Sequence, residues 1–363
     1  MDPKNYSQYI KEQKCPNCGG TVRFVPEKGK LVCEFCDSEF DVKDYIANHN
    51  SDSAGESADD YVTNPAEGES DTSQPMFIYR CGSCSGEILA TESLGSMKCP
   101  FCSNNVVVKE KFTGKFTPDY IIPFEKTKED AIEAYKGYVK SKKLLPKVFF
   151  DQNHIDEIKG IYVPFWLFDA TQNYSASFDA TKVRTWSDHN YHYTETSHYD
   201  ITRLGSERFE KVPVDGSKEM PDDLMESLEP FDQSKMVPFN MGYLAGFLAN
   251  KYNVNADEDQ GRALSRMHSS AITDFRNTIS GYSTLRARSE QCTPSNESSK
   301  YALYPVYILN TSWNGGNYLF AMNGQSGKFV GNLRFSLSRA LMYYFPIAGV
   351  IAAIAFGLFC MFA

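Results

Sequence analysis

Alternating apolar and polar residues mark the middle of the chain as rich in β-structure. Over 160–186 and 191–216, β-branched and aromatic residues alternate with polar ones. This period-2 pattern is typical of strands with one face buried. Both stretches are therefore predicted to be largely β.

Helical spacing appears at three places. A helix is predicted over 128–142, where Ile132, Tyr135 and Val139 share one face; Thr127 is a suitable N-cap with Asp130 three residues later. A second helix is predicted over 257–279 and a short one from Pro221. Helices mixed with strands place the central part in the α+β class.

The central part contains a short internal sequence repeat. The stretch YVPFWLFDA at 162–170 aligns with LYPVYILNT at 303–311, and each has proline at its third position. A second strand is predicted after each stretch, NYSASFDA at 173–180 and NYLFAMNG at 317–324, and the later copy ends at Asn323-Gly324, a strong hairpin signal. This predicts a duplicated β-hairpin, although short strand segments can also match by chance.

The last 23 residues, 341–363, carry no charge. As a helix they would measure roughly 34 Å, enough to cross a hydrocarbon core of about 30 Å. Arg334 and Arg339 precede the run and no charge follows it, which favours a cytoplasmic N-terminal side. The prediction is a single-pass cell-membrane protein with its bulk in the cytoplasm. A buried C-terminal hairpin helix is the alternative.

Two cysteine sets carry the clearest chemistry. Each contains two CxxC pairs separated by 14 residues. The first set is Cys15, Cys18, Cys33 and Cys36, and the second is Cys81, Cys84, Cys99 and Cys102. Zinc prefers four tetrahedral thiolates, and four thiolates leave no position for a reactive water. The sequence therefore predicts two structural Zn²⁺ ions in two zinc ribbons, rather than redox dithiols.

These signals predict five segments. They are ribbon 1 over 1–50, a linker over 51–75, ribbon 2 over 76–116, an α+β central domain over 117–335 and the transmembrane helix over 341–363. The linker holds seven acidic residues and no basic ones, so it cannot bury enough apolar surface to fold. We expect it to let the ribbons move independently.

Other candidate sites are weak. His189, His192 and His198 cluster in the sequence, but residues 189 and 192 of a strand face opposite sides, which favours surface histidines. Cys292 lies in a polar stretch, read as a loop, and Asp222-Asp223 fits a solvated helix start. The stretch NGQSGKF over 323–329 departs from the phosphate-loop pattern. We expect no catalytic residues and no enzyme activity.

Several phrases together resemble a family. The ribbon motifs, GIYVPFWLFDA, FEKVPVDGS, PDDLMESLEPFD and YPVYILNTSWNGGNYLFAMNGQSGKFVG, followed by an apolar tail, resemble the bacterial double zinc-ribbon membrane proteins. Members are often described as TFIIB-type zinc ribbon-containing or primosomal-helicase-like. The resemblance implies protein partners such as SPFH-domain or phage-shock-type membrane proteins. The helicase description finds no phosphate loop here.

Charge weighs against nucleic acid. The whole chain has a net charge of −9, and residues 1–50 hold 7 basic and 8 acidic side chains. Residues 76–116 hold 5 basic and 3 acidic side chains, so the ribbons have net charges of −1 and +2. Charges this small cannot supply the usual phosphate attraction. The favoured function is an adaptor that recruits protein partners to the cytoplasmic membrane surface, with lipid bilayer and protein as its partners. A nucleic-acid-binding ribbon protein is the alternative, and an enzyme with an unrecognised site in the central domain is the third possibility.

Overall fold

The computed structural model describes residues 14–45, 77–90, 99–102, 108–111, 118–142, 145, 149, 155, 157–313, 316–331 and 337–362. The acidic linker predicted over 51–75 lies outside these residues. The main sheet has the strand order β10–β7–β12–β8–β11–β5–β4–β6, with β9 paired to β8, and with β13 paired to β12 and β14. A separate small sheet holds β1 (Val22–Val25), β2 (Lys30–Cys33) and β3 (Glu39–Phe40) in that order.

The strands of the main sheet have these bounds: β4 Phe77–Arg80, β5 Glu87–Ala90, β6 Val108–Lys111, β7 Tyr120–Ile121, β8 Lys159–Ser187, β9 His192–Asp215, β10 Val237–Pro238, β11 Leu248–Asn250, β12 Thr284–Trp313, β13 Gly316–Asn323 and β14 Phe329–Gly331. The helices are α2 Lys128–Ser141, α4 Asp222–Leu228, α5 Ala256–Asn277 and α6 Leu337–Phe362, with the short 3-10 helices η3 Gln233–Lys235 and η4 Met241–Leu244. The β-rich stretches 160–186 and 191–216 and the helices after Thr127 and Pro221 are confirmed, and α5 ends two residues earlier than predicted. The second strand predicted at 173–180 is wrong, because these residues continue β8 and the strand that returns beside it is β9.

The strand faces follow the period-2 pattern of the sequence. In β8, Ile161, Val163 and Phe165 join one hydrophobic cluster, which α4 covers, while Tyr162 joins a second cluster, which α2 covers. The start of α2 is fixed by a capping box, in which the Asp130 N–H donates to Thr127 Oγ1 (3.2 Å) and the Thr127 N–H donates to Asp130 Oδ2 (2.9 Å). The sheet is therefore buried on both faces in the centre of the molecule.

The two repeated stretches, 162–170 and 303–311, lie side by side. β8 and β12 pair antiparallel, and Val163 stands opposite Tyr304, its own counterpart in the sequence alignment. The Pro164 carbonyl accepts from the Gly216 N–H, and the Pro305 carbonyl accepts from the Gly324 N–H, both at 2.9 Å. These matched contacts relate the two hairpins by a local two-fold axis at the pair Val163 and Tyr304.

The duplication extends beyond the hairpins. β7 pairs parallel with β12, and β11 pairs parallel with β8 at the corresponding register. Ile121 of β7 and Ala249 of β11 hold equivalent positions in these pairings, and α2 and α5 each begin seven residues later, at Lys128 and Ala256. The body is thus built from two β–α–β–β units that share one sheet.

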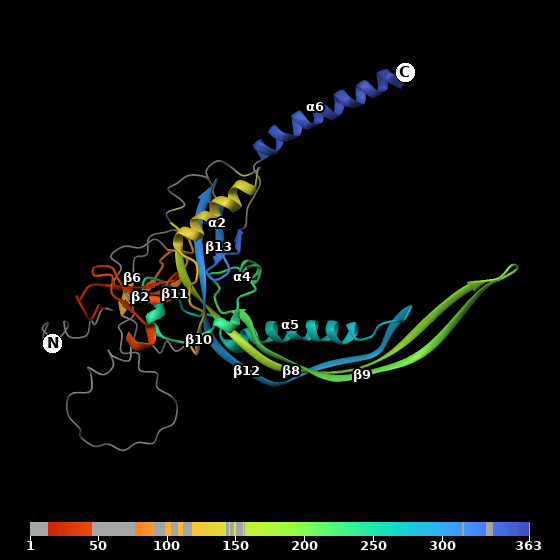
Figure 1. Ribbon diagram of the computed structural model, residues 1–363, viewed down its shortest axis with the longest axis horizontal. Helices are drawn as coiled ribbons and strands as arrows, with labels where there is room; N and C mark the ends of the chain where they lie inside the picture. Colours follow the sequence, from red (N-terminus) through yellow and green to blue (C-terminus); the bar gives the residue numbers. More distant parts are fainter. Residues whose placement is uncertain are drawn as a thin grey trace, which may run out of the picture.

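A long arm extends from the body. β8, β9 and the first half of β12 continue beyond the body as an antiparallel ribbon, and α5 lies along part of it (Figure 1). At about 3.3 Å per residue, a strand as long as β9 measures roughly 80 Å. Phe275 of α5 stacks on Tyr174 of β8, with ring centroids 4.5 Å apart. Beyond α5, Trp186 and Tyr193 stack on each other while remaining partly exposed.

The C-terminal helix α6 projects from the body in Figure 1 and includes Pro346. A membrane crossing needs about 20 consecutive, predominantly apolar residues in one helix. Among the residues that the structure describes, no helix has both the length and the apolar character for this. The predicted transmembrane helix over 341–363, and with it the single-pass cell-membrane localisation, is therefore wrong.

Candidate metal centres

The two ribbons use the same turn to present their first two cysteines. In ribbon 1, the Cys15 N–H donates to the Gly20 carbonyl (2.7 Å) and the Gly19 N–H donates to the Cys15 carbonyl (2.8 Å). In ribbon 2, Cys81 pairs with Gly86 and Ser85 with Cys81 in the same way, at 3.0 and 2.9 Å. The turn requires a left-handed residue, Gly19 in one copy and Ser85 in the other, with φ of 73° and 60°.

Short strands bring the second cysteine pair of ribbon 1 to the first. β1 (Val22–Val25), β2 (Lys30–Cys33) and β3 (Glu39–Phe40) form a meander with Val22 opposite Cys33. Val22, Phe24 and Leu31 are buried in its small core together with Cys15 and Cys33. A core of this size gives little folding energy, so a metal ion at the cysteines would stabilise the ribbon strongly.

In each ribbon the four sulfur atoms lie within 4.8 Å of one another. The closest Sγ–Sγ distances are 3.4 Å for Cys18–Cys33 and 3.5 Å for Cys15–Cys36. In ribbon 2 they are 3.5 Å for Cys81–Cys102 and 3.6 Å for Cys84–Cys99.

These distances match a tetrahedral metal site. Four sulfurs at about 2.3 Å from one ion would be about 3.8 Å apart, whereas a disulfide needs about 2.05 Å. The predicted cysteine sets are therefore brought together, and each can hold a metal ion.

The local environment already favours a thiolate in each set. The Ser38 side chain and then its N–H donate to the Cys36 sulfur and lower its pKa to about 6. Burial opposes ionisation of Cys81, but the N–H groups of Cys84 and Ser83 outweigh it and lower its pKa to about 7. Burial raises the pKa of Cys99. A metal ion would displace the remaining protons, so acid should release it.

The ribbons are attached to neighbouring parts of one segment. Ribbon 1 contacts residues 241–247, where the Phe24 N–H donates to the Ala245 carbonyl (3.1 Å) and the Phe24 ring meets the edge of Tyr243. β5 of ribbon 2 pairs directly with β11, which follows at Leu248–Asn250. The acidic linker predicts two independently moving ribbons. In the structure both ribbons pack on the body, and ribbon 2 continues its sheet.

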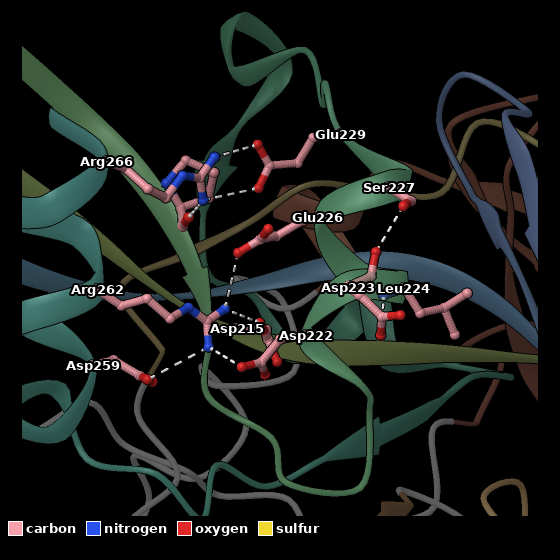
Figure 2. Close-up of polar contacts among 11 residues, drawn as sticks. Asp215, Asp222, Asp223, Leu224, Glu226, Ser227, Glu229, Asp259, Arg262 and Arg266 are labelled. Atoms are coloured by element: carbon pink, nitrogen blue, oxygen red, sulfur yellow. Dashed lines mark hydrogen bonds and ion pairs between the residues drawn. The ribbon is translucent and has the colours of Figure 1, made fainter. Parts of the chain in front are cut away.

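A second polar cluster surrounds Arg262 on α5 (Figure 2). Its guanidinium lies 2.7 Å from Asp215 at the end of β9, and 2.8 Å from Asp222 at the start of α4. Glu226 and Asp259 lie 3.7 and 3.9 Å away. One turn later on α5, Arg266 forms a two-bond contact with Glu229. The cluster therefore joins α4, α5 and the end of the first hairpin.

Asp215 is the unusual member of this cluster, because it is only 3% exposed. Burial raises its pKa to about 6, despite the opposing effect of Arg262. The sequence pattern predicts a solvated helix start at Asp222 and gives no role to Asp215 or Arg262. One signal was available, since Asp215 and Asn323 hold equivalent positions in the two hairpins, and only the first is charged.

The histidine and cysteine candidates outside the ribbons lie apart from these sites. His192 and His198 are exposed in β9, and His189 is exposed in the turn before it, as the surface interpretation predicts. The His192 ring nitrogen Nδ1 lies 2.6 Å from Ser187 Oγ. Cys292 lies in β12 rather than in a loop, and its thiol donates to Gln172 Oε1 at 3.4 Å. The described metal-ligand groups consist of the eight ribbon cysteines.

Together, fold and site define a class: a protein with two four-cysteine metal-binding ribbons on a duplicated β–α–β–β body with a long β-arm. The chain belongs to the same family as "Uncharacterized protein YdjG" of Bacillus subtilis (strain 168). The two are 30% identical over 340 residues, which cover 93% of this chain and 94% of that protein. No family model and no solved structure matches the chain.

Proposed function

We propose that this protein is a zinc-binding adaptor, in which two structural Zn²⁺ ions hold the ribbons in shape for docking to protein partners. The carrying observation is that both ribbons gather four thiolates, a set that fills the coordination sphere of zinc. A filled sphere leaves no open position for an activated water. The metal in each ribbon would then supply folding energy and no chemistry.

The chemistry of the donor set favours zinc over harder ions. Thiolates are soft ligands that bind Zn²⁺ well, whereas Mg²⁺ and Ca²⁺ prefer oxygen. In the proposed state Cys15, Cys18, Cys33 and Cys36 hold one ion. Cys81, Cys84, Cys99 and Cys102 hold the other.

Ion pairs within ribbon 1 support protein partners over nucleic acid. Arg23 pairs with Glu34 at 3.0 Å, and Lys28 and Lys30 lie 2.6 and 3.8 Å from Glu39. Phosphate binding would need these cations to leave their carboxylates, and it would depend strongly on salt. Partners suggested by the resemblance, SPFH-domain and phage-shock-type proteins, are the first to test.

The test combines metal content with partner capture. Zinc should be present at two ions per chain, and replacement by Co²⁺ should give the absorption of tetrahedral cobalt thiolate. Proximity labelling with wild type, Cys18→Ser and Cys84→Ser should show partners that require an intact ribbon. An octahedral cobalt spectrum, or a partner set identical in all three forms, would count against the adaptor.

A further inference from the structure

A cleft of about 480 Å³ lies between ribbon 1 and the body. We propose that this cleft is a docking groove for a partner peptide with an apolar centre and lysine or arginine flanks. The inference rests on the proposed adaptor function and names the chemistry of its partner. The groove has a ribbon wall, residues 23–27, 32–34 and 37, and a body wall, which includes the start of α2, Gly160, Phe247 and Tyr307.

The floor of the groove is apolar. Val25, Pro26 and Val32 of ribbon 1 and Phe247 of the body are only half-buried, so their surfaces remain available to a ligand. Phe247 is held rigidly, since its ring stacks on Phe124 with centroids 4.2 Å apart. A cleft of this volume with a rigid apolar floor suits two or three side chains of an extended peptide.

The rim of the groove is predominantly acidic. It holds four carboxylates against two cations, Arg23 and Lys128, and Arg23 is already paired with Glu34 at 3.0 Å. The other three carboxylates are those of Glu27, Asp37 and Glu129, which are exposed. Rim charges select partners and speed association, so a basic flank is favoured and an acidic one is repelled.

The groove also depends on the metal site of ribbon 1. Cys33 lines the groove and belongs to the first cysteine set. The ribbon wall is held against the body by the Phe24–Ala245 hydrogen bond and the Phe24–Tyr243 ring contact. Loss of zinc from ribbon 1 would remove the wall, and with it the groove.

The experiment pans a random nonapeptide display library against the zinc-loaded full chain. Peptides with one or two large apolar residues flanked by lysine or arginine should be enriched. The best of them, labelled with fluorescein, is then titrated with protein and followed by fluorescence polarisation. The double variant Glu27→Lys, Glu129→Lys should weaken binding by about 3- to 30-fold, as expected for two exposed ion pairs. Added salt should weaken wild-type binding as well.

The matched control is Glu133→Lys, which reverses an exposed charge one turn further along α2, outside the groove. Its affinity should equal that of wild type, while Cys18→Ser should abolish binding. The docking proposal would be overturned by any of three results: no enrichment, enrichment of acidic peptides, or a double variant that binds as tightly as wild type. Partner labelling that still requires intact ribbons would then leave the adaptor standing, so the two proposals fail separately.

Discussion

The buried carboxylate of Asp215 should make the protein less stable as the pH rises. Its pKa is raised from 3.8 to about 6, chiefly by burial. Between these values the native state holds a proton that the unfolded chain has lost, so the free energy of unfolding falls as pH increases through this window. The full difference corresponds to about 3 kcal/mol.

The variant Asp215→Asn should remove this dependence, because an amide does not titrate. The second hairpin already carries an amide at the equivalent position, Asn323, so the substitution has a precedent in the fold. Of the total, about 1.4 kcal/mol falls between about pH 5 and about pH 7.5. The stability of wild type minus that of Asp215→Asn should therefore decrease by about this amount over that range.

Urea unfolding of the zinc-loaded proteins at both pH values measures the difference. Proton competition for the thiolates affects both proteins equally and cancels. Asp222→Asn is the matched control: it removes an exposed partner of the same arginine and should stay within about 1 kcal/mol of wild type at both pH values. If the difference instead increases with pH, the Arg262 ion pair outweighs burial, and the reasoning is wrong.

Three further predictions concern the duplicated body and the ribbons. Asn323→Asp should lower the free energy of unfolding by about 3–5 kcal/mol at neutral pH, because it buries a charge and removes the Nδ2 donor to the Leu228 and Pro230 carbonyls. A loss below about 1 kcal/mol in urea unfolding would contradict this. Gly324→Ala should lower the free energy of unfolding by about 1–3 kcal/mol, since the new Cβ would lie 2.6 Å from Phe124. In Gly137→Ala, within α2, the new Cβ meets nothing within 4 Å, so this variant should be more stable by up to about 1 kcal/mol. Equal effects of the two variants would refute the packing argument. Cys84→Ser should lower the melting temperature of the body more than Cys18→Ser does, because β5 of ribbon 2 continues the main sheet while ribbon 1 only docks on it. Hydrogen exchange at 248–250 should likewise be faster in Cys84→Ser than in Cys18→Ser, and the reverse order would contradict the prediction.

The sequence by itself determined the local features of this protein. Two CxxC pairs at fixed spacing gather because each knuckle is one tight turn, and the capping box at Thr127 starts α2 within four residues. The strand alternation over 160–186 and 191–216 was equally readable, since period 2 depends only on neighbouring residues. The repeat of 162–170 at 303–311 indicated the duplication, although the antiparallel pairing of the two copies was not visible in it.

Only the tertiary structure decided which distant residues meet. The attachment of both ribbons to 241–250, the groove beside Phe247 and the partners of Arg262 all join segments far apart in the chain. The transmembrane prediction for 341–363 was wrong as well, because no helix among the described residues combines the length and the apolar character that a membrane crossing needs. Local patterns record short-range sterics and capping, whereas burial and charge pairing are properties of the packed molecule.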